Sequence, residues 1–311
     1  MDAKPTTAYL MTYKTGKCTS NCAFCSQART SKSSAALLSR VSWPTFPTEI
    51  TLKALANAVR EGKIKRVCIQ ALNYPSVFGD IKALVKGIQI QVIVPVSVSC
   101  QPFNKENIML LAEAGVDRLG IALDAATEEL FFKVKGEVAG GVHSWDGQFN
   151  LLKESVMVFG KEKTSTHIIA GLGETEREAV QIIQRCVDMC ILPALFAFTP
   201  IPGTKLEGKP PPSLESYRHL QLARYLIVKG LVRIRELQFD GNDQIIGFGL
   251  TGSTLKSVIE SGEPFRTSGC EDCNRPFYNE KPSGPIYNYP RKLNTKEIEE
   301  IKQQLNAGFR K

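Results

Sequence analysis

The chain is predicted to be an α/β protein, because short β-rich runs alternate with amphipathic helical windows along most of its 311 residues. Its composition agrees, since 43% hydrophobic residues are enough for a sizeable core. Repeated strand and helix units of this number indicate a TIM-type (βα) barrel, partial or full. In such a barrel, chemistry collects at the C-terminal ends of the strands.

Seven strands are predicted from short runs rich in apolar and β-branched residues, and a weaker pattern adds an eighth. They cover residues 8–13, 66–71, 91–99, 118–123, 165–170, 195–199, 231–239 and 244–248. Helices are expected where a capping residue precedes an apolar period, and three of them end at a glycine. The capping residues are Thr48, Asn104, Thr175 and Ser213, and the glycines are Gly62, Gly115 and Gly230.

The C-terminal part of the chain has a different character. From residue 262 it is rich in Pro, Gly, Asn and Tyr without a regular period, until a final helix predicted over 295–309. A disordered linker rarely carries two cysteines and several aromatic residues in so short a span, so an ordered loop is favoured. We expect a barrel over 1–261 and a C-terminal extension over 262–311 that folds over the barrel mouth.

Charge and apolar patterning limit the partners. The formal charge is +8, but Lys and Arg are spread along the chain without interleaved aromatics, so no nucleic-acid partner is expected. The cationic bias indicates either a solvated surface or docking to an acidic carrier protein. The longest apolar runs have the length of strands, so no membrane partner is expected. Nine cysteines without a secretory signal indicate a reducing, cytoplasmic location.

Three cysteines near the start carry the strongest chemical signal. Cys18, Cys22 and Cys25 in KCTSNCAFC are spaced to occupy three corners of a four-iron cube. One iron is then left without a protein ligand and can bind a small molecule. A structural zinc site needs a fourth Cys or His nearby, but the next cysteine is Cys68, so the open cluster is favoured over zinc.

This triplet resembles that of the radical S-adenosylmethionine (SAM) superfamily, in which SAM chelates the fourth iron. The resemblance implies that Phe24 shields the cluster, although a hydrophobic anchor is an equal alternative. It also implies an adenine contact at Ile169, with Gly171 and Gly173 freeing the backbone of the HIIAGLGETERE turn. His167 departs from the pattern, which usually has Gly there.

Two further positions bear on SAM binding. Asp124, in GIALDAATEE, is placed to bind the ribose hydroxyls or, alternatively, to cap the helix that begins near Thr127. The segment CIQALNYP lacks the Gly-Gly-Glu that grips the SAM amino group in the superfamily, so Gln70 or Asn73 would have to serve.

The remaining cysteines suggest a second cluster. Cys68 and Cys100 lie in the second and third predicted strands, and Cys270 and Cys273 form a CxxC in the extension. If the extension folds over the barrel, these four thiolates can hold one closed four-iron cluster. A zinc site at the CxxC, or a merely buried Cys68, are the alternatives. Cys186 and Cys190, four apart on one predicted helix, are interpreted as structural thiols.

Together with the segments ALDA, GLGET and TPIPGT, these cysteines resemble biotin synthase and its relatives. Biotin synthase uses a further cysteine shortly before GLGET to bind its sulfur-donating cluster, and Ser165 stands there, so a true biotin synthase is not expected. The extension resembles that of archaeal biotin-synthase-like proteins that act in pairs as a two-component lipoyl synthase.

That resemblance implies sulfur insertion into an octanoyl chain on a lipoyl carrier protein. It also implies a paralogous radical SAM component and a low-potential electron donor such as ferredoxin. Ser268 is a candidate ligand of the second cluster. The alternatives are a biotin-synthase-like mutase or maturase that inserts no sulfur, and a non-catalytic metal-binding scaffold.

Overall fold

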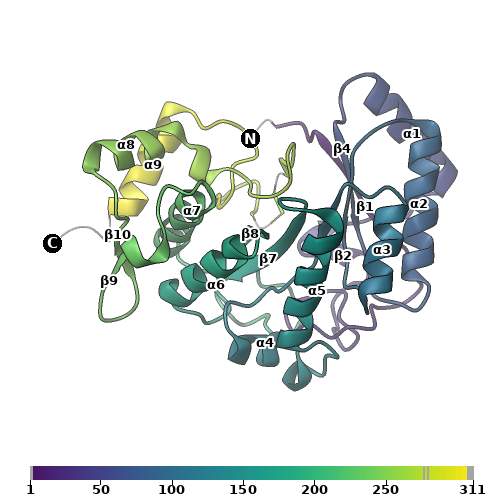
Figure 1. Cartoon of the computed structure of the whole chain (residues 1–311), viewed down its shortest axis with the longest axis horizontal. Helices are drawn as coiled ribbons and strands as arrows, with labels where there is room; N and C mark the ends of the chain where they lie inside the picture. The colour runs from purple at the N-terminus through teal and green to yellow at the C-terminus, as the bar shows by residue number, and fades with distance from the viewer. Residues whose placement is uncertain (1–2, 276, 279, 307–311) are drawn as a thin grey trace.

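A curled sheet of parallel strands forms the centre of the molecule (Figure 1). The computed structural model describes residues 3–275, 277–278 and 280–306. Six strands pair in chain order: β1 (Thr7–Met11), β4 (Arg66–Gln70), β5 (Val96–Ser99), β6 (Arg118–Gly120), β7 (Thr164–Ala170) and β8 (Leu192–Ala197). The predicted barrel is therefore confirmed in its partial form, with β1 and β8 as the two edges.

Two predicted barrel strands are wrong. Within 231–248 the chain forms a 3-10 turn, η2 (Ile234–Glu236), and then a separate antiparallel pair, β9 (Gln238–Phe239) with β10 (Ile245–Gly247). The physical reason is the connection, because a turn of a few residues allows only antiparallel pairing, whereas a parallel strand needs a crossover of a dozen or more. A second short hairpin, β2 (Leu37–Leu38) with β3 (Val41–Ser42), follows the first cysteine loop.

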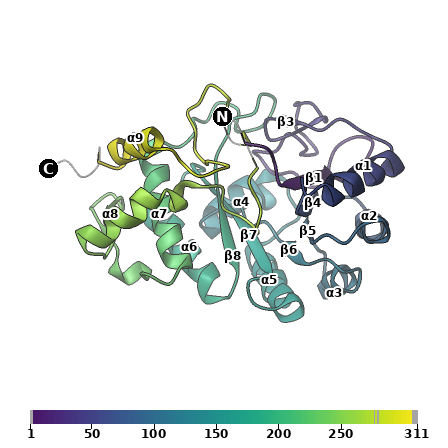
Figure 2. The same ribbon diagram turned by 90° about the horizontal axis from the view of Figure 1, so that it is seen from above.

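The α-helices are α1 (Thr48–Arg60), α2 (Val77–Gln91), α3 (Lys105–Glu113), α4 (Glu128–Val134), α5 (Trp145–Phe159), α6 (Glu176–Asp188), α7 (Leu214–Val228), α8 (Gly252–Ser261) and α9 (Thr295–Asn306). Most of them lie around the outer side of the sheet, as Figure 2 shows, whereas α9 packs on α7 and α8 packs on α9. Helix α2 ends at Gln91, the first residue of the range predicted as the third strand, and β5 begins only at Val96. The end of the predicted final helix, 307–309, lies outside the described residues. No helix in the described ranges is long and apolar enough to cross a membrane.

Three of the four predicted helix caps are confirmed. The side chains of Asn104, Thr175 and Ser213 each accept a hydrogen bond from a backbone amide of the first turn. Thr48 is different, because it is the first residue of α1 and Pro47, which precedes it, has no side-chain acceptor. Helix α6 has the strongest start, where Thr175 forms a reciprocal capping box.

The extension closes the open side of the half-barrel. Leu195 in β8 donates its amide to Ser268 Oγ at 2.8 Å, and Thr7 in β1 donates its hydroxyl to the carbonyl of Asp272 at 2.9 Å. Further on, Ser39 donates to the carbonyl of Tyr278 at 3.2 Å, next to the β2–β3 hairpin. The extension thus joins the two edge strands (Figures 1 and 2). The extension reaches the N-terminal end of β1 as well as the hairpin after the cysteine loop. It therefore spans the half-barrel along its length, whereas the sequence predicts only a cover over the mouth.

Candidate active site

The concave face of the sheet and the extension enclose a cavity of about 280 Å³. Three of the predicted SAM-contact residues, Phe24, Asp124 and Ile169, line its wall. So do seven of the nine cysteines: Cys18, Cys22, Cys25, Cys68, Cys100, Cys270 and Cys273. The cavity therefore collects the two groups of thiols that the sequence separates by large distances.

The first cysteine loop is held in place by backbone hydrogen bonds. The Cys18 amide donates to the carbonyl of Gln27 at 3.0 Å, and the Thr19 amide donates to the carbonyl of Asn73 at 2.9 Å. The amide of Asn73 in turn points at sulfur and donates to Cys18 Sγ at 3.2 Å. Such a donor stabilises a thiolate more than a thiol, which suits a sulfur that binds iron.

Burial favours the protonated form of two thiols of the triplet in the absence of metal. It raises the pKa of Cys25 to about 11 and shifts the pKa of Cys22 upward as well. A cluster supplies the positive charge that a buried thiolate lacks, so the donor set fits iron-sulfur ligation. Across the described ranges, no three His, Cys, Asp or Glu side chains converge as a single metal ion requires. A four-iron cluster takes one thiolate at each iron and spaces its ligands more widely.

A buried ion pair stands beside the triplet. Lys135 Nζ lies 2.7 Å from Asp124 Oδ2, and the two side chains are 1% and 8% exposed. Asp124 has a left-handed φ of +70° and does not cap α4; Thr127 does so, by accepting from the amide of Leu130. The capping alternative for Asp124 is therefore wrong. Sequence reasoning missed Lys135, because no motif marks a lysine just beyond the end of a helix.

A short polar chain on the other side of the loop was also missed. Asn73 Nδ2 donates to Ser20 Oγ at 2.6 Å, and Ser20 lies 2.9 Å from Nε2 of His143. Burial, and then the charge of Lys135, lower the pKa of His143 to about 4, which leaves a neutral imidazole at neutral pH. The two candidates for binding the SAM amino group contact different groups of thiols. The backbone amide of Asn73 donates to Cys18 Sγ, whereas the Gln70 side chain donates to Cys68 Sγ at 3.0 Å.

The glycine turn serves a different purpose from the predicted one. Gly171 and Gly173 have φ values of +99° and +134°, as a turn with free amides requires. Yet the Glu174 carboxylate accepts from the amides of Gly171, Leu172 and Gly173 at 2.5–3.0 Å. The chain's own carboxylate thus fills this nest, and neither glycine lines the cavity. Of this segment, Ile169 is the predicted residue that reaches the cavity wall.

A second group of thiols lies on the first strands of the sheet. Tyr9, Cys68 and Ser97 are in register on β1, β4 and β5. From the extension, Cys273 Sγ lies 3.4 Å from the Tyr9 hydroxyl, and Cys270 Sγ accepts from Ser97 Oγ at 3.5 Å. Burial, together with the charges of Cys273 and Cys270, raises the pKa of Cys68 to about 12. The structure therefore brings three of the four predicted ligands together.

Cys100 lines the same cavity, but no contact in the described residues joins it to the other three thiols. Side chains alternate between the two faces of a strand, so Cys100 falls on the face opposite to that of Ser97 and Ser99. It packs in the hydrophobic core and is 4% exposed. Burial alone raises its pKa, with no contribution from another thiol. Ser268, the other candidate ligand, is bonded through its hydroxyl to both the amide and the carbonyl of Leu195.

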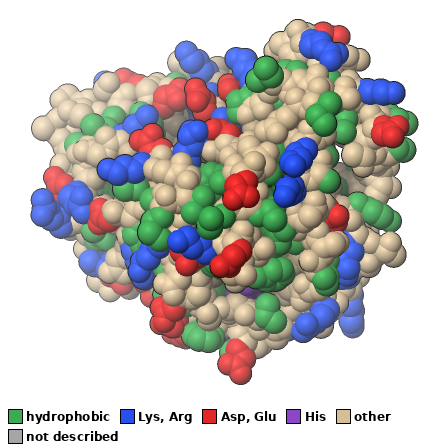
Figure 3. Space-filling model, turned by 45° about the vertical axis from the view of Figure 1, so that its right-hand side comes forward, with side chains coloured by type: hydrophobic (Ala, Val, Ile, Leu, Met, Phe, Trp, Pro, Cys, Tyr) green, Lys and Arg blue, Asp and Glu red, His purple; other side chains and the backbone are tan. Residues whose placement is uncertain are grey.

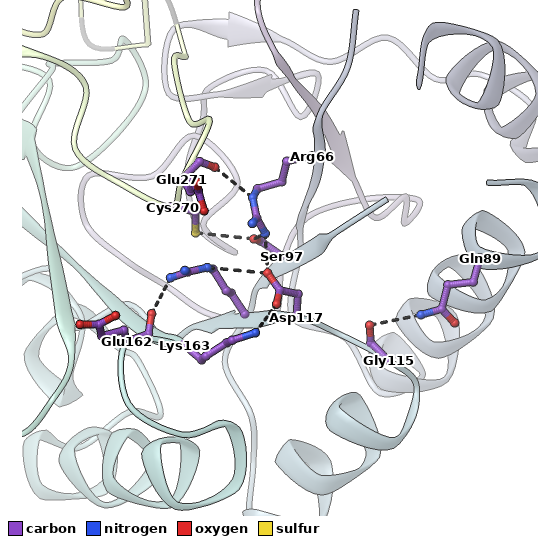
Figure 4. Close-up of polar contacts among 10 residues, drawn as sticks. Arg66, Gln89, Ser97, Gly115, Asp117, Glu162, Lys163, Cys270 and Glu271 are labelled. Carbon is purple, nitrogen blue, oxygen red and sulfur yellow. Dashed lines mark hydrogen bonds and ion pairs between the residues drawn. The ribbon is translucent and has the colours of Figure 1, made fainter. Parts of the chain in front are cut away.

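Arg66 anchors the CxxC loop from the side (Figure 4). Its Nε donates to the carbonyl of Glu271 at 3.0 Å, and its Nη1 donates to Ser97 Oγ at 3.0 Å and to Asp117 Oδ2 at 2.8 Å. The Ser97 hydroxyl in turn donates a hydrogen bond to Cys270 Sγ. Arg66 thus fixes both the backbone after Cys270 and the donor that faces its sulfur.

Arg275 places a cation beside this second group, and no ion pair to it is found among the described residues. Its guanidinium stacks 3.7 Å from the ring centre of Tyr278 and 4.8 Å from that of Tyr9. One of its nitrogens is buried and has no hydrogen-bond partner among the residues that the structure describes. Its charge lowers the pKa of Cys68, although burial raises that pKa more. A buried, unsatisfied donor beside three thiols fits a group that carries negative charge, as a thiolate-bound cluster does.

Comparison with known proteins identifies the class. The family model for the radical SAM superfamily matches residues 12–186, so the chain belongs to that superfamily. Membership implies a four-iron cluster with an open iron, and SAM as its ligand. The cavity, with Cys18, Cys22 and Cys25 at one side, is the candidate place for both.

Among curated proteins the chain is similar to biotin synthases. It is 30% identical to that of Persephonella marina over 64% of this chain and 56% of that protein. It is 27% identical to that of Allorhizobium ampelinum, over 73% of this chain and 67% of that protein. The chain therefore spans little more than half of the first relative.

Solved structures confirm the fold alone. Methylornithine synthase superposes with a TM-score of 0.55 at 15% identity, over 73% of this chain and 63% of that one. The FeFe-hydrogenase maturase of Carboxydothermus hydrogenoformans gives 0.54 at 11% identity, over 98% and 77%.

Proposed function

We propose that this radical SAM enzyme inserts sulfur into an octanoyl chain on a lipoyl carrier protein, as one component of a two-protein lipoyl synthase. The observation that carries the proposal is the second group of thiols. Cys68, Cys270 and Cys273 line the same cavity as the SAM-cluster triplet. A sulfur-bearing group there would face the place where a substrate radical forms.

The substrate chemistry requires this arrangement. An unactivated methylene has no acidic proton, so acid and base groups of the protein cannot begin its reaction. When bound, the first cluster with SAM supplies a deoxyadenosyl radical, and a second cluster supplies sulfide. The chain's own part is to enclose the space, with Phe24 and Ile169 in its wall, and to hold the two thiol groups apart.

Metal analysis tests the second cluster. Anaerobically reconstituted protein should hold about eight irons, and Cys22→Ala and Cys68→Ala should each lose about four. Cys186→Ala is the matched control, because Cys186 is buried in α6 and outside both groups, so its iron content should equal wild type. About four irons in the wild type, unchanged in Cys68→Ala, would refute the second cluster.

Product analysis tests the reaction and the division of labour. Octanoyl carrier protein is incubated with SAM, reductant, this chain and its paralogous component, and the modified lysine is examined by mass spectrometry. We expect two sulfur atoms with both components and little or no full product when either is omitted. Complete lipoyl formation by this chain alone contradicts the pairing. Failure to gain any sulfur with both components contradicts the proposed function itself.

A second candidate is a biotin-synthase-like mutase or maturase that inserts no sulfur. The position of Cys100 favours it, since only three predicted ligands gather at the second site. Cys68→Ala separates the candidates. A mutase or maturase keeps full turnover without that thiol, whereas sulfur insertion stops while SAM cleavage continues. A non-catalytic scaffold is excluded if wild type cleaves SAM reductively and Cys22→Ala does not.

A further inference from the structure

The first cysteine site lies in an unusually basic stretch of chain. Residues 3–48 contain no Asp or Glu, and their cations are Lys4, Lys14, Lys17, Arg29, Lys32 and Arg40. These six charges compare with a formal +8 for the whole chain. On the face drawn in Figure 3, by contrast, Lys and Arg lie among Asp and Glu. Much of the basic surplus therefore belongs to the segment that carries the cysteine loop.

Two other loops add to this surface. The amide of Lys32 donates to the carbonyl of Gly203 at 2.8 Å, which places Lys205 beside the cysteine loop. Lys205 Nζ donates to the carbonyl of Ala139 at 2.9 Å, and Arg29 donates to the next carbonyl, that of Gly140, at 3.1 Å. Arg29, Lys32 and Lys205 are thus neighbours in space, and all three are exposed.

These cations have no acidic partner within the part of the chain that is described. Glu207 is nearby, but its carboxylate accepts from the amide of Gly203. Glu137 is the other acidic residue close along the chain. Lys205 and Arg29 bind the carbonyls of Ala139 and Gly140, and close to these in the chain Val138 and Val142 are 71% and 77% exposed. Exposed apolar side chains beside such cations have the composition of a protein-binding surface for an acidic partner.

This basic surface lies directly outside the first cysteine site. A small hollow of about 10 Å³, separate from the large cavity, is walled by Cys22, Cys25 and Lys205 among others. The thiols thus have the substrate cavity on one side and this hollow on the other. A partner that docks here would be close to the iron site without entering the substrate cavity.

We propose that Arg29, Lys32, Lys205, Val138 and Val142 form the docking surface for an acidic one-electron donor protein. The proposal rests on the radical SAM chemistry of the first site and is independent of sulfur insertion. A reduced donor bound here gives up one electron for each SAM cleaved and leaves oxidised. An acyl carrier is disfavoured at this position, because its substrate arm must reach the large cavity on the other side of the thiols.

Reductive SAM cleavage with two reductants tests the surface. The triple variant Arg29→Glu/Lys32→Glu/Lys205→Glu is compared with wild type, using either a reduced acidic bacterial ferredoxin or dithionite. We expect the ferredoxin-driven rate at low salt to fall about tenfold, because charge complementarity steers association. With dithionite, which needs no docking surface, the rate should stay within about twofold, which shows that the iron site is intact.

Controls keep the outcome decisive. Lys53→Glu/Lys86→Glu/Lys229→Glu reverses three exposed charges on other helices and should leave the ferredoxin rate unchanged. Lys32→Glu alone changes a side chain with no hydrogen bond in the described structure, and should lower that rate severalfold with less structural risk. In wild type, added salt should slow ferredoxin-driven cleavage. Equal ferredoxin rates in the basic-surface variants and wild type overturn the proposal. So does weakened binding of octanoyl carrier protein with ferredoxin turnover intact. If wild type does not cleave SAM with dithionite, the result counts against the radical SAM activity and not against the docking surface.

Discussion

Replacing Lys135 by methionine is expected to destabilise the protein strongly. The Lys135 side chain is 1% exposed and Asp124, its partner at 2.7 Å, is 8% exposed. Methionine fills a similar volume but leaves the aspartate charge buried and unpaired. Removing one partner of such a pair costs about 3–5 kcal/mol. Urea slopes of about 1–3 kcal/mol per molar then place the shift in the unfolding midpoint at about 1 M or more.

The assay is urea unfolding of metal-free protein under anaerobic, reducing conditions. Lys133→Met is the matched control, since Lys133 pairs with Glu129 on the surface of the same helix, at 56% and 78% exposure, and its midpoint should barely move. Adding Asp124→Asn to Lys135→Met removes the orphaned charge and should recover most of the loss, and asparagine tolerates the left-handed backbone there. If Lys135→Met shifts the midpoint no more than Lys133→Met, the pair does not stabilise the fold as argued.

Three further predictions concern the loops around the cavity. Gly203→Ala should lower the free energy of unfolding by about 1–3 kcal/mol, because the φ of Gly203 is +81° and an added Cβ would lie 2.5 Å from the backbone nitrogen of Ser33. Gly208→Ala is the control, since a Cβ there meets no atom within 4 Å, and equal urea midpoints for the two variants would contradict the prediction. Arg66→Met removes the donor to the carbonyl of Glu271, so trypsin should cut the extension severalfold faster, and unchanged cleavage would show that other contacts hold it. Burial lowers the pKa of His143 in the folded protein to about 4, whereas its pKa in the unfolded chain is near 6.5. Between these values the unfolded chain binds the extra proton, so the contribution of the neutral imidazole to stability is present above about pH 6.5 and is lost as the pH falls to about 4. His143→Gln should therefore flatten the pH dependence of unfolding of the metal-free protein, and an identical pH profile would exclude the effect.

Local signals in the sequence were enough for the six parallel strands of the half-barrel and for placing Cys18, Cys22 and Cys25 together at the end of the first strand. The strands of the half-barrel repeat a regular period, and the triplet is complete within eight residues, so neither depends on distant contacts. The prediction of two barrel strands within 231–248 was wrong, because a strand-like run does not show whether the connection to it is long enough for a parallel crossover.

The second site needed the tertiary structure. The prediction joined Cys68 to the CxxC correctly in space but included Cys100, since spacing alone does not say which face of a strand a residue occupies. Lys135, Arg66 and Arg275 carry no motif at all. Their importance comes from burial beside an opposite charge or a thiol, which no single-sequence pattern encodes.

The extension that joins β8 to β1 also makes the two groups of cysteines available at different times. Cys18, Cys22 and Cys25 are neighbours in the chain, so their site becomes available early in synthesis. The second group needs Cys270 and Cys273, which emerge from the ribosome only near the end and must then reach across the half-barrel to Cys68. If the second group holds the proposed cluster, its loading awaits closure of the last loop, and a nascent or C-terminally truncated chain lacks that sulfur source.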